Sequence, residues 1–228
     1  MPDVKQRPIL FKAPMVNAIL EGRKSMTRRV VKPQPDQRYQ LFECHRDGTC
    51  EVGLHIDSPN HYQISCPYGK VGDRLWVKET WIPDPNADHD CWDDHTCTYV
   101  EWSGCGTRID EVPPAMRKPE HCIYRASWNG GDLIWKPSIF MPRWASRITL
   151  EITGVRVERL QDISNDDAVA EGCPGWYSPQ HPDQGCTDGR TPSEEFCELW
   201  QSINGPGSWE ANPWVWVISF KRVEIANG

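Results

Sequence analysis

The sequence lacks the apolar run of about 20 residues that a membrane-spanning helix requires. Its first residues, MPDVKQRPILF, also lack the basic start and following apolar stretch of a secretory signal. These two absences predict a cytoplasmic protein that has no membrane partner. With 228 residues the chain can bury a full hydrophobic core, so we expect a single domain over residues 1–228.

Several motifs of catalysis and cofactor binding are missing as well. The chain contains no Walker phosphate-binding loop, no G-x-S-x-G elbow and no dinucleotide-binding glycine fingerprint. No C-x-x-C pair occurs among the ten cysteines, and the spacing of Cys91, Cys97 and Cys105 fits no standard zinc pattern. The sequence therefore predicts no metal or cofactor at the site, with a structural zinc in an insertion as the alternative. Without a secretory signal, we expect most cysteines to be reduced.

Excess positive charge is also lacking, with 25 Lys and Arg against 32 Asp and Glu. This balance argues against sequence-independent coating of long nucleic acids. The acidic excess lies in residues 84–111, where eight acidic residues accompany Arg108. Residues 21–32 instead hold five basic residues and one acidic residue. Such a basic turn can bind one anionic group or a short nucleic acid, or it can be a solvated loop.

Apolar patterning predicts short strands and short helices. Strands are expected at residues 9–11, 74–81, 123–126, 148–160 and 213–223, and helices at 14–21, 164–171 and 191–204. Stretch 148–160 can be one bent strand or a hairpin. Loop-rich surface insertions are expected at residues 33–65, 83–121 and 173–190, which are rich in Pro, Gly, Asp, Cys and His. These elements predict an α+β domain or a small barrel.

The most informative stretch is GRKSMTRR, from Gly22 to Arg29. Gly22 is expected to end a helix and turn the backbone, so that Lys24 and Thr27 leave a constrained loop and converge on one site. The neighbouring arginines lower the pKa of Lys24 and raise its fraction of neutral amine. Such a lysine suits a base or a nucleophile, although a phosphate clamp that needs only permanent charge fits the same spacing.

The pattern Gly22-x-Lys24-x-x-Thr27-x-Arg29 resembles the G-x-K-x-x-T-x-R signature of the ASCH domain. That domain is a small β-barrel related to the PUA domains that bind RNA. The stretches GDRLWVKETW and MPRWASRITLE are similar to the ASCH proteins of bacteriophages and prophages. The resemblance implies an α+β, PUA-like (ASCH) barrel with short flanking helices, and it leaves the three insertions unmatched.

Small bacterial members of the ASCH family remove the acetyl group from N4-acetylcytidine. They use a lysine and a threonine of the signature and a glutamate at the end of a later short helix. The resemblance therefore implies that Lys24, Thr27 and Glu171 are catalytic in a metal-independent amidohydrolase. Either Lys24 or Glu171 can be the base, and an exposed carboxylate at a helix end is the alternative for Glu171.

Other residues are predicted to bind the substrate, a modified nucleoside, a nucleotide or a short RNA. They are Arg28, Arg29, Arg143 and Trp144. Trp135 and Phe140 can also stack a base, with core packing as the alternative for these aromatic residues. A monomer is favoured. A non-catalytic reader of RNA or modified DNA and a ribonuclease remain alternatives, because other ASCH members bind or cleave nucleic acid.

Overall fold

The computed structural model describes residues 4–36, 40–53, 62–83, 92–93, 98–99, 108–130, 133–175 and 190–223. Within these residues the fold is mixed α+β, as predicted. The helices are α1 (Ala13–Leu20), α2 (Asn165–Ala170) and α3 (Pro192–Asn204). The described strands form open sheets, and no closed barrel is present among them. None of the described helices is long and apolar enough to cross a membrane.

The largest sheet has the strand order β1-β6-β11-β12-β2. Its strands are β1 (Gln6–Leu10), β6 (Arg74–Lys78), β11 (Thr149–Arg159), β12 (Trp214–Val223) and β2 (Met26–Val30). A second sheet contains β3 (Gln40–Cys44), β4 (Thr49–Gly53) and β5 (Tyr62–Ser65). Two short pairs join β7 (Trp81–Pro83) to β10 (Cys122–Tyr124) and β8 (Trp92–Asp93) to β9 (Thr98–Tyr99).

Local sequence signals set the ends of the helices. The Ser164 side chain accepts a hydrogen bond from the Asp167 N–H, which starts α2. Thr191 and Glu194 form a reciprocal capping box at the start of α3. Gly22 and Gly172, with φ of 76° and 94°, follow α1 and α2 in the left-handed conformation.

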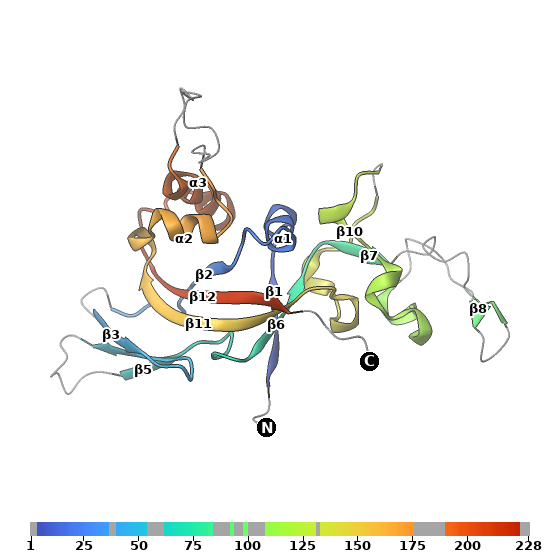
Figure 1. Cartoon of the computed structure of the whole chain (residues 1–228), viewed down its shortest axis with the longest axis horizontal. Helices are drawn as coiled ribbons and strands as arrows, with labels where there is room; N and C mark the ends of the chain where they lie inside the picture. Colours follow the sequence, from blue (N-terminus) through green and yellow to red (C-terminus); the bar gives the residue numbers. More distant parts are fainter. Residues whose placement is uncertain are drawn as a thin grey trace. The chain divides into compact units, whose positions relative to one another are not determined.

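Strand β2 differs from the expectation, because the sequence predicts a loop around Thr27. In the structure this segment pairs antiparallel with β12, and Thr27 lies opposite Ile218. The strand is hard to recognise because one of its buried residues is Arg28. Residues 148–160 contain the single long strand β11, which curves in Figure 1, and no hairpin.

The first predicted insertion is not only a loop, since it contains the antiparallel sheet β3-β4-β5. Cys50 and Val52 of β4 are buried. Cys44 and Cys50 lie directly opposite each other on β3 and β4 and form a disulfide, where the sequence predicts reduced thiols. Four other described cysteines carry thiols: Cys66, Cys122, Cys173 and Cys197. Most of the second and third insertions lies outside the described residues.

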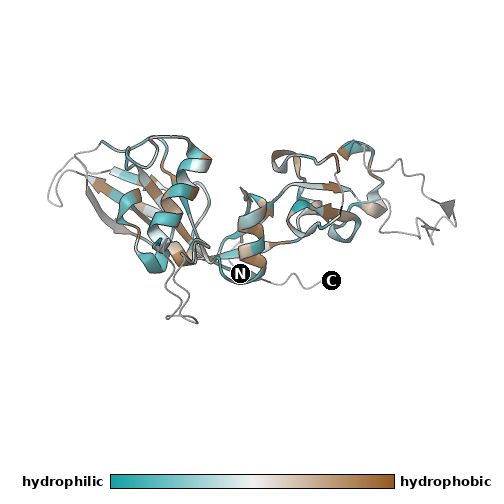
Figure 2. Cartoon of the chain, turned by 90° about the horizontal axis from the view of Figure 1, so that it is seen from above, coloured by the Kyte–Doolittle hydropathy of each residue, from teal (hydrophilic) through white to brown (hydrophobic). Residues whose placement is uncertain are grey.

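The chain folds as two compact units. Unit 1 consists of Met1–Gln6, Ala18–Arg74 and Leu150–Arg222, and unit 2 consists of Arg7–Asn17, Leu75–Thr149 and Val223–Gly228. In unit 1, α2 and α3 lie on one side of β11 and β12, and the β3-β4-β5 sheet lies on the other (Figure 1). Hydrophobic residues follow the strands beneath helices that are largely hydrophilic on their outer side (Figure 2).

Each unit has a hydrophobic cluster of its own. The cluster of unit 1 contains Met26, Leu160, Ile163, Ala168, Cys173, Phe196, Trp200, Val215 and Val217. The cluster of unit 2 contains Trp81, Cys122, Tyr124, Met141 and Ala145. Full burial of each large apolar side chain contributes about 1.5–3 kcal/mol, so these clusters hold α2 and α3 on β2 and β12, and β7 on β10.

Candidate functional site

Lys24 follows the turn that ends α1. Because Gly22 adopts a positive φ, the chain folds back over the helix end, and the N–H groups of Arg23 and Lys24 both donate to the Ala18 carbonyl. The next N–H, from Ser25, donates to the Ala170 carbonyl at 2.9 Å. This turn therefore places Lys24 against the C-terminal end of α2.

Glu171 caps that end of α2. Its N–H donates to the Asp167 carbonyl at 2.9 Å, and Gly172 then turns the chain out of the helix. A Cβ atom at position 172 would lie 3.2 Å from the Ala18 Cβ and 3.6 Å from the Lys24 Cβ. A glycine at this position thus allows the α1 turn and the end of α2 to approach closely.

Lys24 and Glu171 form a buried ion pair. The Lys24 Nζ lies 2.6 Å from the Glu171 Oε2 and 2.7 Å from the Glu171 backbone oxygen. Both residues are only 3% exposed. One ammonium group therefore satisfies both a carboxylate and a helix-end carbonyl. The exposed helix-end carboxylate considered as the alternative for Glu171 is not observed.

Burial lowers the pKa of Lys24, because the protonated amine loses its hydration. Attraction to Glu171 offsets part of this effect, and Arg29 adds repulsion. The Lys24 ammonium therefore gives up a proton more readily than that of an exposed lysine. Burial also raises the pKa of the nearby Cys173 thiol to about 12, so this thiol is protonated at neutral pH and is a poor nucleophile.

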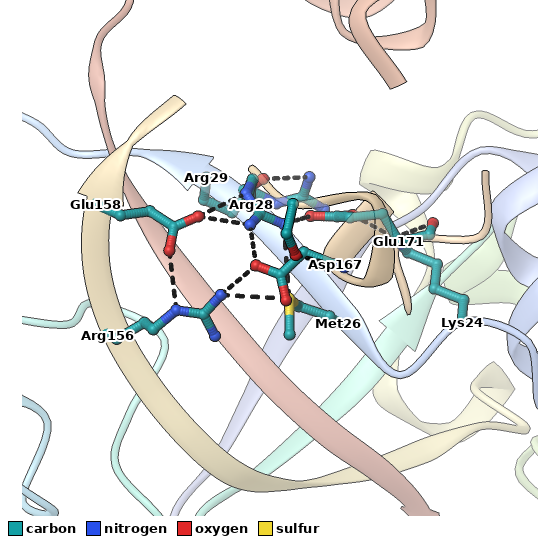
Figure 3. A network of polar contacts seen from close by, with 9 residues as sticks. Lys24, Met26, Arg28, Arg29, Arg156, Glu158, Asp167 and Glu171 are labelled. Carbon is teal, nitrogen blue, oxygen red and sulfur yellow. Dashed lines mark hydrogen bonds and ion pairs between the residues drawn. The ribbon is translucent and has the colours of Figure 1, made fainter. Parts of the chain in front are cut away.

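Arg28 links the ion pair to two further carboxylates. Its guanidinium donates to Glu171 Oε1 at 3.4 Å, to Asp167 Oδ2 at 2.6 Å, and to Glu158. Figure 3 shows Arg28 between these three acidic side chains. Burial alone would lower the pKa of Arg28, but Glu158, Glu171 and Asp167 together more than offset it, so the pKa lies above its ordinary value. The guanidinium predicted to contact substrate is thus bound by the protein's own carboxylates.

Arg156 completes the network. Its Nε donates to Glu158 Oε2 at 2.9 Å, and its guanidinium also donates to Asp167 (Figure 3). Sequence reasoning did not identify Arg156, Glu158 or Asp167 as site residues. The available signal was the alternation of Arg156 and Glu158 with valines in β11, which places both charges on one face of the strand.

Thr27 and Arg29 lie on β2, on either side of Arg28. Met26 and Val30 pack into the cluster beneath the helices, so the alternation of a strand puts Arg28 on that face and Thr27 and Arg29 on the opposite face. Thr27 is buried and Arg29 is half-buried. Burial lowers the pKa of Arg29, and Tyr68 and Glu171 offset this only in part. Arg28 hydrogen-bonds Glu171.

Arg143 and Trp144 belong to unit 2, as do Trp135 and Phe140, whereas the predicted residues Lys24, Thr27, Arg28, Arg29 and Glu171 belong to unit 1. The Arg143 guanidinium lies 5.9 Å from the centre of the Trp76 ring. Trp144 packs edge-on against Trp81, with 5.4 Å between the ring centres. Both side chains therefore take part in the packing of unit 2 itself.

Within the described residues, no group of three or more His, Cys, Asp or Glu side chains could hold a metal ion. Cys91, Cys97 and Cys105, considered for a zinc site in an insertion, lie outside these residues. No protein-family model, curated protein or solved structure matches the chain. The geometry of the site and the signature around Lys24 are therefore the two indications of function.

Proposed function

We propose that the protein is a metal-independent amidohydrolase that removes an acyl group from the exocyclic nitrogen of cytosine, as in N4-acetylcytidine. One observation carries the proposal: Lys24 Nζ and Glu171 Oε2 lie 2.6 Å apart in a buried site. The resemblance to ASCH amidohydrolases selected the same two residues from segments far apart in the chain. The proposal includes the PUA-like barrel that the resemblance implies, and the curved strand β11 supports this assignment.

Hydrolysis adds water across the amide C–N bond. In the proposed reaction the Glu171 carboxylate accepts a proton from water while the new C–O bond forms. The Lys24 Nζ–H donates to the carbonyl oxygen as negative charge develops on it. When the C–N bond breaks, Lys24 gives a proton to the leaving nitrogen, to which its lowered pKa is suited. The proton held by Glu171 then returns to Lys24, and acetic acid and cytidine leave.

The other side chains have supporting roles in this proposal. Arg28 positions Glu171 through the contact to Oε1, and Glu158 and Asp167 fix Arg28 in turn. By the resemblance, Thr27 orients the acyl carbonyl and Arg29 holds the pyrimidine O2 or a phosphate. Both residues lie on the face of β2 opposite Arg28, and the charge of Arg29 acts on Lys24 and Glu171 from that face. Because Lys24 and Glu171 are buried, substrate reaches them only after the surrounding side chains move apart.

The test is incubation of the purified protein with N4-acetylcytidine while absorbance follows its conversion to cytidine. We expect turnover by the wild type and a loss of at least about 100-fold in Lys24→Ala and in Glu171→Gln. Glu79→Gln is the matched control, because Glu79 is an equally buried carboxylate bound by Arg147 in unit 2. This variant should keep its turnover.

A folded wild-type protein that leaves N4-acetylcytidine unchanged would contradict the assignment. In that case the same variants would be assayed for RNA cleavage and for binding of RNA and modified DNA, the two alternatives that the signature allows.

A further inference from the structure

Unit 2 contains a groove of about 440 Å³ that the proposed reaction does not use. The segment Ile134–Phe140 forms one wall of the groove, and residues 108–110 line the groove as well. Ile134 is 86% exposed and Phe140 is 63% exposed. Adjacent apolar side chains with this much exposure are typical of an interaction surface.

The segment that carries these side chains is fixed to unit 2. Lys136 forms hydrogen bonds in both directions with the backbone of Trp81, which is buried. The Lys78 ammonium donates to the Ile139 carbonyl, and Met141 is buried directly after the segment. Trp135 and Phe140 are therefore held in place beside the groove before any partner binds.

Positive charges accompany the aromatic rings of this segment. The Arg125 guanidinium lies 5.6 Å from the centre of the Trp135 ring, and Lys136 lines the groove itself. Nearby, the Lys78 ammonium lies 5.5 Å from the centre of the Trp76 ring. Residues 108–148 hold seven basic and four acidic residues, in contrast to the acidic chain as a whole.

Among the described residues that line the groove, one is acidic, Asp110. It pairs with Arg108 at 3.2 Å, and both side chains are well exposed. An exposed pair of this kind contributes little free energy, so Arg108 can exchange Asp110 for an incoming anion. The groove therefore combines aromatic faces with a net positive charge.

We propose that this groove binds a short single-stranded nucleic acid. A base stacks on the rings of Phe140 and Trp135, and Lys136 and Arg125 contact the adjacent phosphates. Aromatic faces with nearby cations are the combination that single-stranded nucleic acids require, because every base has a π-face and every linkage carries a charge. A groove for an apolar peptide has no such need for cations beside its rings. The inference stands independently of the proposed hydrolase activity, because all of these residues belong to unit 2.

The test uses the full chain and a fluorescent oligouridylate of about ten nucleotides, with binding followed by anisotropy at low salt. Phe140→Ala should weaken binding about tenfold, whereas Phe140→Tyr should retain it because a phenol ring also stacks. The matched control is Ile139→Ala. Ile139 is 60% exposed on the same turn but does not line the groove, so its loss should leave the affinity unchanged.

Two further variants decide the chemistry of the partner. Phe140→Leu keeps an apolar side chain without a ring, and we expect it to weaken binding as much as Phe140→Ala. Lys136→Ala should reduce the slope of log affinity against log salt by about one. The proposal is overturned if the wild type does not bind the oligonucleotide, if Ile139→Ala weakens binding as much as Phe140→Ala, or if Phe140→Leu retains full affinity, as an apolar peptide partner would require. Lys24→Ala should leave this binding intact, which separates the result from that of the turnover assay.

Discussion

The two units each bury a cluster of opposite charges, and the clusters differ in how their carboxylates are bound. In unit 2, both oxygens of Glu79 accept hydrogen bonds from Arg147, at 2.9 and 3.0 Å. The Arg147 guanidinium also lies 4.0 Å from the centre of the Tyr124 ring. In unit 1, Lys24 holds one oxygen of Glu171 at 2.6 Å, and Arg28 lies 3.4 Å from the other.

In the proposed reaction, this difference separates a structural pair from a reactive one. Arg147 engages both oxygens of Glu79 in short parallel hydrogen bonds. Glu171 instead has one long contact, so that Oε1 can accept a hydrogen bond from water. Its other partner, Lys24, can lose a proton, which an arginine cannot do at neutral pH. A buried glutamate with a basic partner thus supports packing in unit 2 and, in the proposed reaction, proton transfer in unit 1.

The largest effect is expected from Arg28→Met. This change removes a donor shared by Glu158, Asp167 and Glu171, and the free energy of unfolding should fall by about 3–5 kcal/mol, as for other broken buried ion pairs. Arg147→Met leaves a single carboxylate, that of Glu79, without its arginine partner, so the free energy of unfolding should fall by less. Urea denaturation of both variants measures the two losses. An equal or smaller loss in Arg28→Met would contradict the claim that the shared network of unit 1 stabilises the fold more than the single pair of unit 2.

A smaller effect is expected from Gly172→Ala. Because residue 172 has a positive φ, a side chain there should lower the free energy of unfolding by about 1–2 kcal/mol. The new Cβ atom would also lie only 3.2 Å from the Ala18 Cβ, beside Lys24. Gly22→Ala is the matched control, because Gly22 has a similar φ but no atom within 4 Å of the added Cβ. Both variants should lose stability in thermal unfolding, but only Gly172→Ala should also slow turnover. Equal turnover in the two would contradict the placement of Lys24 by this close approach.

The smallest effects concern pH and should have opposite signs in the two units. Burial raises the pKa of Glu79 above 4.5, so the folded protein binds this proton more tightly than the unfolded chain does. The resulting contribution to the free energy of unfolding is fully present below pH 4.5 and is lost as the pH rises through the raised pKa. Burial lowers the pKa of Lys24 below 10.5, so the folded protein releases this proton at a lower pH than the unfolded chain does. The free energy of unfolding therefore increases as the pH rises from the lowered pKa to 10.5.

Unfolding free energies measured across pH test both statements. Wild type should lose stability relative to Glu79→Gln in the acidic window and gain it relative to Lys24→Met in the alkaline window. If either difference has the reverse sign, the ion-pair partner dominates over burial at that residue.

Part of this site could be predicted from the sequence. Glycines encode both helix ends, and the signature with its family resemblance selected Lys24 and Glu171. Arg156 and Glu158 escaped notice because charged residues on a strand usually face solvent, and only the packing of α2 over β11 shows otherwise. The β3-β4-β5 sheet was missed for a related reason: the pairing of Cys44 with Cys50 depends on a register that composition does not reveal.

The division into two units could not be predicted either, because unit 2 is built mainly from residues 75–149, whose loops and 3₁₀ turns lack a clear periodicity. Its core depends on single side chains such as Trp81 and Met141, which nothing in the pattern distinguishes from surface aromatics and methionines.

The most direct test of the central claim is the turnover of N4-acetylcytidine by Lys24→Arg, measured beside the wild type, with the fold of each protein checked by thermal unfolding. Arginine keeps the positive charge and can donate to Glu171, but it does not release a proton at neutral pH. We predict a folded variant whose turnover is at least about 100-fold below that of the wild type. Turnover at the wild-type rate in Lys24→Arg would contradict proton transfer by Lys24 and leave it the role of a fixed charge.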